Sequence, residues 1–327
     1  MNLYVKEILH TLVDSRNTSE EVDIAIGYGS AVMEHGDQRK SPGLDIILVV
    51  KDVIRFHQVN MRKYPEDYSL LMHLGGAEMF TRIQDTGGAI SYNLMTTPKN
   101  HRQEYGASQR IIKYGVISTE AFIKDLREWL RLYVAGRMHK PFYIIKQGSA
   151  EIQEVIEENL SFAVRVALLL LAKDEVTHEE LFKAITSLSY MGDPRPEHPD
   201  KVRNIVSANR EQFHSLYKNV LTNNEFFQND QDAKLILPPH ARDYMKLHLP
   251  KQVAAMLPEF YMTFDDNVFQ KVMTDAIQRI VSQPALIQIF KGVLTGKPSE
   301  TIPYGISKGL KSPKIRKILT PFGYREK

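Results

Sequence analysis

The spacing of apolar residues predicts a mixture of helices and strands over residues 1–148. Apolar positions at helical spacing run through residues 3–13, and residues 23–28, which are apolar after Asp23, predict a short buried strand. Further strands are expected at residues 44–50, 89–94, 110–116 and 142–145. Asp52 and Ser118 stand where the N-caps of two following helices would lie. This part of the chain is therefore expected to fold as an α/β domain with a mixed sheet.

After Gly148-Ser149 the apolar residues follow helical periodicity alone. Residues 152–171 predict a long helix, and Thr177 with Glu180 has the sequence of a capping box that opens the next one. Further helices are expected at residues 202–221, 250–257, 267–281 and 285–294. We therefore expect an all-helical second domain over 149–302, followed by a basic tail over 303–327.

Composition narrows the class of protein. A chain of 327 residues is longer than one hydrophobic core usually supports, which favours two domains. Because there is no cysteine, disulfides and thiolate metal sites are excluded, and a metal would need oxygen or imidazole ligands. The first residues have no signal or transit character, and the longest apolar run, 166–172, is too short to span a bilayer. A net charge of only +3 argues against a nucleic-acid partner, and a cytoplasmic protein is expected.

The candidate chemistry begins at the end of the first strand. Gly29 allows a tight turn, in which backbone amides and the Ser30 hydroxyl could face an anion such as a triphosphate. Asp45 opens the next strand and would lie across this turn, where it could hold Mg²⁺ against the phosphates. This layout is typical of nucleotidyltransferases. An ordinary turn followed by a solvated edge residue remains the alternative.

Such a site usually has a second carboxylate two residues after the first, on the same face of the strand. In this chain that position is Ile47. Asp52 lies seven extended residues away, or about 23 Å, and is expected to be a helix cap instead. The best candidate is Asp193, in a Gly-Asp-Pro loop of the second domain. A plain turn is the alternative for this loop.

Several strings of the sequence resemble one known family, the mitochondrial translocator assembly and maintenance proteins. These are peripheral phosphatidate cytidylyltransferases. The resemblance extends from about residue 25 to 210, and its most specific string is Lys113 to Ser118. The matching strings are Gly27-Tyr28-Gly29-Ser30, Leu44-Asp45, His57 with Asn60, Tyr68-Ser69, Tyr92-Asn93, Ile112 to Ser118, Tyr133 to Arg137, Lys140-Pro141 and Ser189 to Asp193.

The resemblance implies a nucleotidyltransferase domain over 1–148 and a winged-helix-like helical domain over 149–302. It also implies Mg²⁺-dependent conversion of CTP and phosphatidate to CDP-diacylglycerol and pyrophosphate. The chain differs from mitochondrial members in having no transit segment, which suggests a bacterial relative, and in having Ala31 where they often have glycine.

Site roles follow from this reaction. The phosphate of phosphatidate is already an anion, so positioning and charge neutralisation are expected to matter more than a general base. We expect Gly29 and Ser30 to hold the β- and γ-phosphates, Asp45 and Asp193 to hold the metal, and Lys113 to meet the triphosphate. The remaining nucleotide-binding candidates are His57, Asn60, Tyr92 and Asn93. For each of these residues, packing or solvent exposure is the alternative.

Lipid contacts are expected at two places. Arg137 and Lys140 could meet the phosphatidate head group. The tail after Pro303 has seven basic residues against Glu326 alone, and its apolar residues 315–322 would form one face of a short helix lying on a bilayer. Its candidate membrane residues are Lys308, Lys311, Lys314, Arg316 and Lys317. We thus expect a cytoplasmic enzyme that is peripheral on the inner face of the cell membrane.

Two other functions remain open from the sequence. The same fold could transfer a nucleotide to a tRNA end or to a small molecule. A non-catalytic assembly factor at a membrane surface is also possible, although Ser30, Asp45 and Lys113 favour an enzyme. The sequence leaves the oligomeric state unknown.

Overall fold

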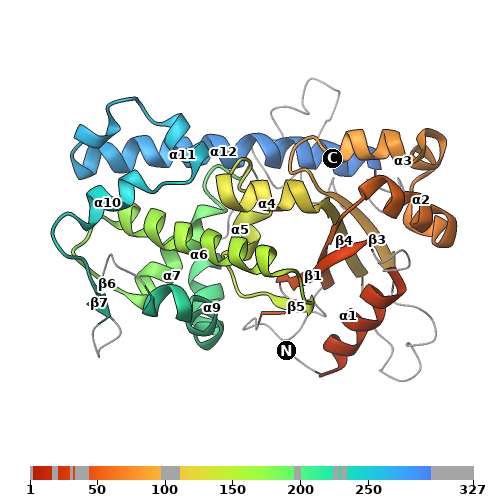
Figure 1. Ribbon diagram of the computed structural model, residues 1–327, viewed down its shortest axis with the longest axis horizontal. Coiled ribbons are helices and arrows are strands. Elements are labelled where there is room, and N and C mark those ends of the chain that lie inside the picture. Colours follow the sequence, from red (N-terminus) through yellow and green to blue (C-terminus); the bar gives the residue numbers. More distant parts are fainter. Residues whose placement is uncertain are drawn as a thin grey trace, which may run out of the picture.

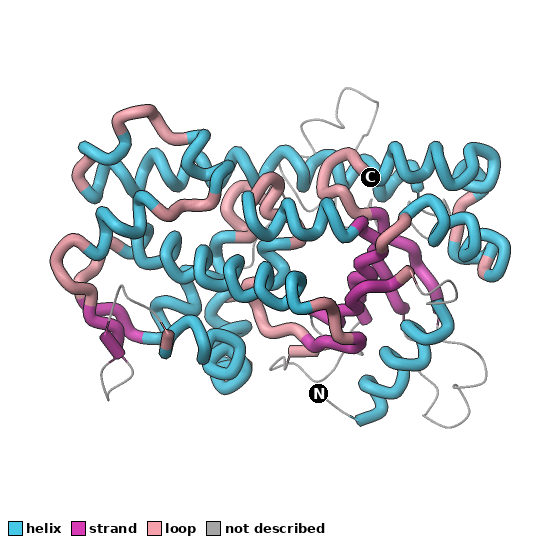
Figure 2. Tube along the Cα trace, viewed as in Figure 1, coloured by secondary structure: helices cyan, strands magenta, loops and turns pink. Residues whose placement is uncertain are grey.

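In the computed structural model, strands and their helices occupy one end of the molecule and a mostly helical part occupies the other (Figures 1 and 2). The structure describes residues 3–16, 21–29, 32–33, 44–96, 111–194, 200–223, 228–229 and 234–295. The last helix, α12 (Asp266–Thr295), runs along both parts (Figure 1).

The α/β part is built on a five-stranded sheet, as predicted. Its strands are β1 (Val22–Tyr28), β2 (Leu44–Val50), β3 (Ser91–Thr96), β4 (Ile111–Ser118) and β5 (Tyr143–Lys146). They lie in the order β3-β4-β2-β1-β5. Only β2 and β4 are parallel, and the other neighbours are antiparallel, so the sheet is mixed.

Helices cover both faces of this sheet, which explains why its central strands are apolar throughout. Alternate residues of β2, such as Ile46 and Leu48, pack with α1 (Leu3–Arg16) and α2 (Val53–Lys63) on one face. Ile47 and Val49 pack on the other face with α4 (Thr119–Glu128) and α6 (Ala150–Leu171). We refer to these as the α1/α2 face and the α4/α6 face.

Both predicted caps are confirmed. The backbone N–H of Arg55 donates to Asp52 Oδ1 over 2.9 Å, and that of Ala121 donates to Ser118 Oγ over 3.1 Å. Such a cap pairs a backbone N–H that has no partner within the helix. Asp52 is therefore the start of α2 rather than a metal ligand.

Two helices of this part were not predicted, the short α5 (Ala135–Met138) and the longer α3 (Leu70–Gln84), which follows the short turn η2 (Pro65–Asp67). Gly76 interrupts α3 with a φ of 69°, a value that few residues other than glycine adopt. This kink disturbs the apolar periodicity by which the helix could have been recognised.

The helical part contains the expected long helix α6 and the capping box of α7 (His178–Leu188), in which Thr177 and Glu180 bond reciprocally. The expected helix at 202–221 is divided at Asn209 into two. The remaining elements are α8 (Lys201–Ala208), α9 (Arg210–Thr222), α10 (Ala241–Leu247), α11 (Lys251–Met256) and η4 (Tyr261–Thr263).

The expectation that this part is all-helical is wrong. Three short strands, β6 (Glu175–Thr177), β7 (Gln228–Asn229) and β8 (Lys234–Ile236), form an antiparallel sheet in the order β6-β8-β7. Strands of two or three residues are too short to show a period of two, so nothing in the sequence distinguishes them from loops.

The two helices expected on either side of Pro284 are one continuous helix, α12. Buried neighbours on both sides, Val281 and Ala285, hold the helix through the proline. Beyond it, Gln288 Nε2 donates to the carbonyl of Ile90, and Lys291 Nζ donates to the carbonyls of Gln84 and Thr86. The end of α12 therefore binds the turn between α3 and β3.

The predicted domain boundary at 148/149 falls between β5 and α6, where Ser149 caps α6. The two parts share one hydrophobic core, which includes Ile24 of β1 and Ile277 of α12. The division into domains therefore stays a prediction. Among the described residues, no helix has the length and apolar character needed to cross a membrane.

Candidate functional site

Asp45 and Lys113 lie side by side at one end of the sheet. They are register partners on the parallel strands β2 and β4, and both belong to the α4/α6 face. Tyr28, the last residue of β1, is the partner of Asp45 on its other side. Since neighbouring strands are about 4.8 Å apart, these three residues form one continuous row across the sheet.

Gly29 lies against Asp45, as the proposed phosphate turn requires. Its φ is 79°, and a Cβ at this position would lie 3.1 Å from Asp45 Oδ2. The carbonyl of Gly29 accepts hydrogen bonds from the N–H groups of Val32 and Met33. Both the backbone conformation and the close approach to the carboxylate favour glycine. The predicted phosphate contact at Ser30 lies outside the described residues.

Three tyrosines and two cations stand beside this carboxylate. Tyr28 Oη donates to Tyr92 Oη over 3.1 Å, and Lys113 Nζ lies 4.0 Å from the centre of the Tyr92 ring. The guanidinium of Arg137 lies 3.8 Å from the ring centre of Tyr133 and 5.8 Å from that of Tyr28. We call Tyr28, Tyr92 and Tyr133 the tyrosine cluster.

The electrostatics of the cluster favour an anion. Burial raises the pKa of Tyr28 while Arg137 opposes the rise, and burial also raises the pKa of Tyr92. Burial lowers the pKa of Arg137, but the tyrosines outweigh it, so the guanidinium stays charged. Among the described residues no carboxylate forms an ion pair with Arg137. A cation that is shielded from water among neutral rings is stabilised by a negatively charged ligand.

Arg137 is held in place by a buried carboxylate that the sequence analysis missed. Arg137 lies on the short helix α5 (Ala135–Met138). Asp125 Oδ2 accepts from the N–H groups of Val134 and Ala135, and Asp125 Oδ1 accepts from that of Arg131. A signal existed in the sequence, since Asp125 stands on the apolar stripe of α4 beside Phe122 and Leu126.

Asn159 of α6 holds the same segment from its other side. Its Oδ1 accepts from Trp129 Nε1 over 2.8 Å, and its Nδ2 donates to the carbonyl of Ala135 over 3.2 Å. His139 Nε2 lies 3.2 Å from the same Oδ1. The segment that presents Arg137 is therefore fixed between the sheet and the helical part.

Lys140 meets the end of α7 rather than open solvent. Its Nζ donates to the carbonyl of Gly136 over 3.0 Å and to Ser189 Oγ over 2.6 Å, and it lies 4.9 Å from the ring centre of Tyr190. Lys201 approaches the same ring at 4.1 Å. Lys140 and Lys201 thus both lie close to the ring of Tyr190 and form a second positively charged site, separate from that of Lys113 and Arg137.

Asp193 lies in the turn that follows Tyr190 at this second positively charged site. Its backbone N–H donates to the carbonyl of Tyr190 over 3.0 Å, and Gly192 before it has a φ of 77°. This is the geometry of the turn that the sequence suggested as the alternative. Within the part of the chain that the structure describes, no group of three or more His, Asp or Glu side chains is placed to hold a metal ion.

The structure divides the nucleotide-binding candidates between the two faces of the sheet. Tyr92 faces the α4/α6 side with Asp45, whereas Asn93 faces the α1/α2 side and donates to Tyr114 Oη over 3.1 Å. His57 and Asn60 are buried on α2, on the same side as Asn93. Consecutive residues of a strand point to opposite faces, so His57, Asn60 and Asn93 do not share a surface with Asp45.

His57 is part of a sealed polar network. Its Nδ1 lies 2.9 Å from Tyr68 Oη and its Nε2 3.0 Å from Gln84 Oε1, and the side chain has no exposed area. Burial lowers the pKa of His57 to about 4, so the ring is neutral near pH 7. In this arrangement His57 supports the contact between α2 and α3.

A second buried network on this face joins η2 to the sheet. Arg16 Nη2 donates to Asp67 Oδ2 over 2.8 Å, and Tyr114 Oη donates to the same oxygen over 2.6 Å. All three side chains are buried. The sequence analysis missed this network, since its members come from three distant segments.

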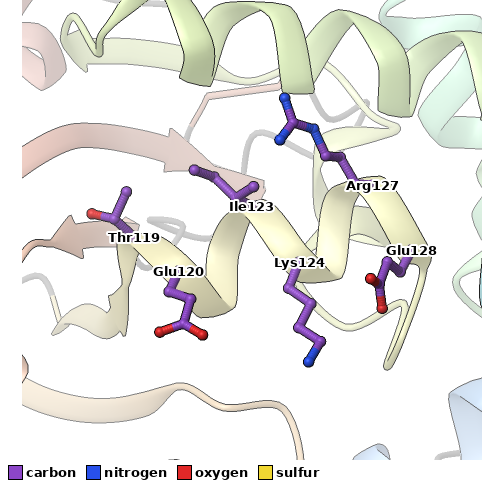
Figure 3. A pocket seen from close by; sticks show the side chains of 6 residues that line it. All are labelled: Thr119, Glu120, Ile123, Lys124, Arg127 and Glu128. Carbon is purple, nitrogen blue, oxygen red and sulfur yellow. The ribbon is translucent and has the colours of Figure 1, made fainter.

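A shallow open depression on α4 contains none of the candidate residues (Figure 3). In Figure 3 Arg127 points toward α6, where it pairs with Glu151 and Glu158. The residues that line it are Thr119, Glu120, Ile123, Lys124, Arg127 and Glu128. It carries charges of both signs on a solvent-facing helix, and we assign it no function.

Comparison with known proteins identifies the family. The model of the family "Phosphatidate cytidylyltransferase, mitochondrial" matches residues 9–311, and the chain belongs to this family. The resemblance found in the sequence is thereby confirmed.

Individual relatives have the same name. The protein from Schizosaccharomyces pombe is 30% identical over 322 residues, which cover 88% of this chain and 79% of the relative. The Danio rerio protein is 30% identical over 315 residues, covering 88% and 90%, and the human protein is 37% identical over 213 residues, covering 63% and 45%. A solved nucleotidyltransferase-like protein from Exiguobacterium sibiricum aligns over 97% of this chain and 87% of its own, at 8% identity and a TM-score of 0.26, and we base no conclusion on it.

Proposed function

We propose that this chain transfers a cytidylyl group from CTP to phosphatidate and forms CDP-diacylglycerol and pyrophosphate. Membership of the phosphatidate cytidylyltransferase family supports the substrate and the reaction. The observation that carries the proposal is the row formed by Asp45 and Lys113, with Gly29 against the carboxylate and Arg137 nearby. It offers one carboxylate and two cations to a polyphosphate.

In the reaction, an oxygen of the phosphatidate phosphate attacks the α-phosphorus of CTP, and the bond from that phosphorus to the bridging β-oxygen breaks. Pyrophosphate leaves with the electron pair. Negative charge increases on the leaving group, so a fixed cation there lowers the barrier. Lys113, held over the Tyr92 ring, would meet the triphosphate, and Arg137 would meet the phosphate of phosphatidate. Lys140, beside Ser189, would extend the positive surface toward the lipid.

A divalent cation, Mg²⁺ in the first instance, is part of the proposal. Asp45 supplies the hard oxygen ligand that Mg²⁺ prefers, and Mg²⁺ usually combines one or two carboxylates with substrate phosphates and water. Because Gly29 has no Cβ, the backbone of the proposed phosphate turn can approach this carboxylate closely. When bound, the ion would neutralise phosphate charge. We keep Asp193 as the second carboxylate from the helical part, and Ser30 as a phosphate contact.

The architecture of the helical part supports a winged-helix-like domain. Its elements run α6, β6, α7, α8 and α9, β7, β8, and β8 lies between β6 and β7. The resemblance implied a winged-helix-like helical domain, and a helical core with a small antiparallel sheet is compatible with it. This assignment is part of the proposal.

A membrane-surface location follows from the acceptor. We propose that the enzyme is peripheral and that the basic tail, with Lys308, Lys311, Lys314, Arg316 and Lys317, contacts anionic lipid. These tail residues lie outside the described residues. The relatives are mitochondrial by name, so the choice between a bacterial inner membrane face and a mitochondrial one is left to localisation experiments.

The direct test supplies labelled CTP, a divalent ion and vesicles that contain phosphatidate, and identifies the lipid product. Labelled CDP-diacylglycerol that disappears with a chelator supports the proposal. Transfer to tRNA or to a small hydroxyl compound instead would identify another acceptor, and no turnover of CTP with any acceptor would favour an assembly factor. Equal use of ATP would contradict the choice of base.

Substitutions of the two proposed metal ligands, Asp45 and Asp193, can be compared with a control substitution at Asp52. Asp45→Ala should leave less than a tenth of wild-type turnover, a loss above ~1.4 kcal/mol, because the row would lose its metal ligand. Asp52→Ala, which removes only the α2 cap, should cost about 1 kcal/mol of stability and keep turnover. Asp193→Asn with unchanged turnover would return Asp193 to a turn residue.

A further inference from the structure

The first turns of α3 expose three leucines on one side of the helix. Leu70 is 75% exposed, Leu71 47% and Leu74 78%. Among the described residues, Leu74 and Leu70 are the most exposed large apolar side chains. Positions 0, 1 and 4 of a helix fall within about 100° of one another, so the three side chains form one patch. We call residues 70–74 the leucine turn.

The rest of the helix and the loop before it are fixed, so this exposure is built into the fold. Met72, on the opposite side of the leucine turn, is buried with Tyr68 and Phe80. Asp67, just before the turn, is held by Arg16 and by the hydroxyl of Tyr114. The leucine turn therefore projects from a rigid base.

This base connects the leucine turn to the sheet that carries the site, through the α1/α2 face and so opposite the face of Asp45 and Lys113. Tyr114, which binds Asp67, is the neighbour of Lys113 in β4. The loop that leads into α3 is thus tied to the strand that carries the triphosphate candidate. The patch lies beside the strands of the site rather than at the far helical end, and α3 occupies an outer position in Figure 1.

The last turns of α12 lie next to the end of α3. Lys291, near the end of α12, donates to the carbonyl of Gln84 at the end of α3. Figure 1 shows the end of α12 beside α3. The chain continues from Thr295 for 32 further residues, and these include the basic segment. The leucine turn and the last turns of α12 therefore belong to the same end of the molecule.

The end of α2 adds charge of the same sign. Arg62 and Lys63 are exposed in its last turn, with Glu66 as the nearby acidic residue. His73 of the leucine turn lies 2.9 Å, through Nε2, from the carbonyl of Pro65, so α3 starts close to this basic end. Aliphatic side chains beside basic ones match the two layers of an anionic bilayer surface, acyl chains below and phosphates above.

We propose that the leucine turn inserts into the surface of a phosphatidate-containing bilayer and positions the site over its lipid substrate. This inference rests on the proposed lipid acceptor. The three leucines enter the acyl boundary, while Arg62 and Lys63 contact the lipid phosphates. Because the base of the turn is rigid, insertion fixes the distance of the sheet from the membrane.

The test uses the full chain, with Leu70, Leu71 and Leu74 all changed to Ser. Binding is measured by flotation with phosphatidylcholine vesicles containing phosphatidate, at a salt concentration that screens the tail. The triple variant should lose at least tenfold in vesicle affinity and keep its thermal stability. Leu247→Ser, at a leucine 66% exposed on α10, is the matched control and should bind as the wild type does.

Depth of insertion has an independent measurement. Trp129 is the one tryptophan of the chain and is fully buried, so a tryptophan placed at the surface can be followed against it. Leu74→Trp emission should shift to shorter wavelength on addition of the vesicles and be quenched by brominated acyl chains. Leu247→Trp should show neither effect.

The outcomes separate this inference from the proposed function. Turnover of a short-chain, water-soluble phosphatidate should be equal in the wild type and the triple variant, since no membrane is involved. If the wild type does not use phosphatidate at all, the proposed function fails. The role of the leucine turn would be overturned if the triple variant bound vesicles as tightly as the wild type does. It would also be overturned if the substitutions changed the oligomeric state and left vesicle binding intact.

Discussion

Replacing Gly29 by alanine tests the geometry of the site most directly. The new Cβ would lie 3.1 Å from Asp45 Oδ2, closer than ordinary contact, so the carboxylate would have to move by a few tenths of an ångström. Mg²⁺ accepts oxygen ligands close to 2.1 Å in near-ideal geometry, with a tolerance of about 0.2 Å. We therefore expect Gly29→Ala to lower turnover at least tenfold, or about 1.4 kcal/mol in the barrier.

The same substitution also strains the backbone, and the chain offers a control for this effect. Gly76 has a φ of 69°, close to the 79° of Gly29, but no atom lies within 4 Å of its Cβ position. Alanine at either glycine should cost stability because φ is positive at both, and the cost at Gly76, where ψ is 177°, should be of order 1–3 kcal/mol. Only Gly29→Ala brings a side-chain atom against Asp45.

The assay measures turnover of CTP with short-chain, water-soluble phosphatidate, alongside urea unfolding of both variants. Similar losses of stability with a selective loss of turnover in Gly29→Ala would support the metal role of Asp45. The reasoning is refuted if Gly29→Ala and Gly76→Ala turn over equally well. A raised requirement for divalent ion in Gly29→Ala would locate the defect at the metal.

Three further substitutions probe the surroundings of the site. Arg137→Met should raise the KM for phosphatidate tenfold or more with little loss of stability, because a half-buried cation is removed from the anion site. Initial rates at varied phosphatidate measure this change, and an unchanged KM would contradict it. Asp125→Ala should lower the free energy of unfolding by about 2–4 kcal/mol, since three backbone N–H groups lose their acceptor, as urea unfolding would detect. Burial lowers the pKa of His57 to about 4, so the contribution of this ring to the free energy of unfolding is complete above pH 6.5 and falls by about 1.4 kcal/mol per pH unit toward pH 4. His57→Gln should therefore reduce the pH dependence of the free energy of unfolding by that slope. An unchanged slope would show that the native ring is protonated in this range.

Local sequence determined the strands of the larger sheet, the caps of three helices and the pairing of Gly29 with Asp45. The caps at Asp52, Ser118 and Thr177 were predictable, because a cap bonds to a backbone N–H only two or three residues away. The strands of the sheet were recognisable as apolar or β-rich runs. Gly29 and Asp45 could be paired from sequence, since they lie at the facing ends of two strands that follow one another in the chain and pair antiparallel.

Only the tertiary structure decided which candidates face the same ligand. Tyr92 and Asn93 are neighbours in the sequence, yet the pleat of β3 sends them to opposite faces of the sheet. The buried partners of Asp67 and Asp125 depend on the packing of segments that are far apart or on a turn that closes back on a helix. Such contacts form when strand register and helix packing bring groups together, and neither is encoded within a window of a few residues.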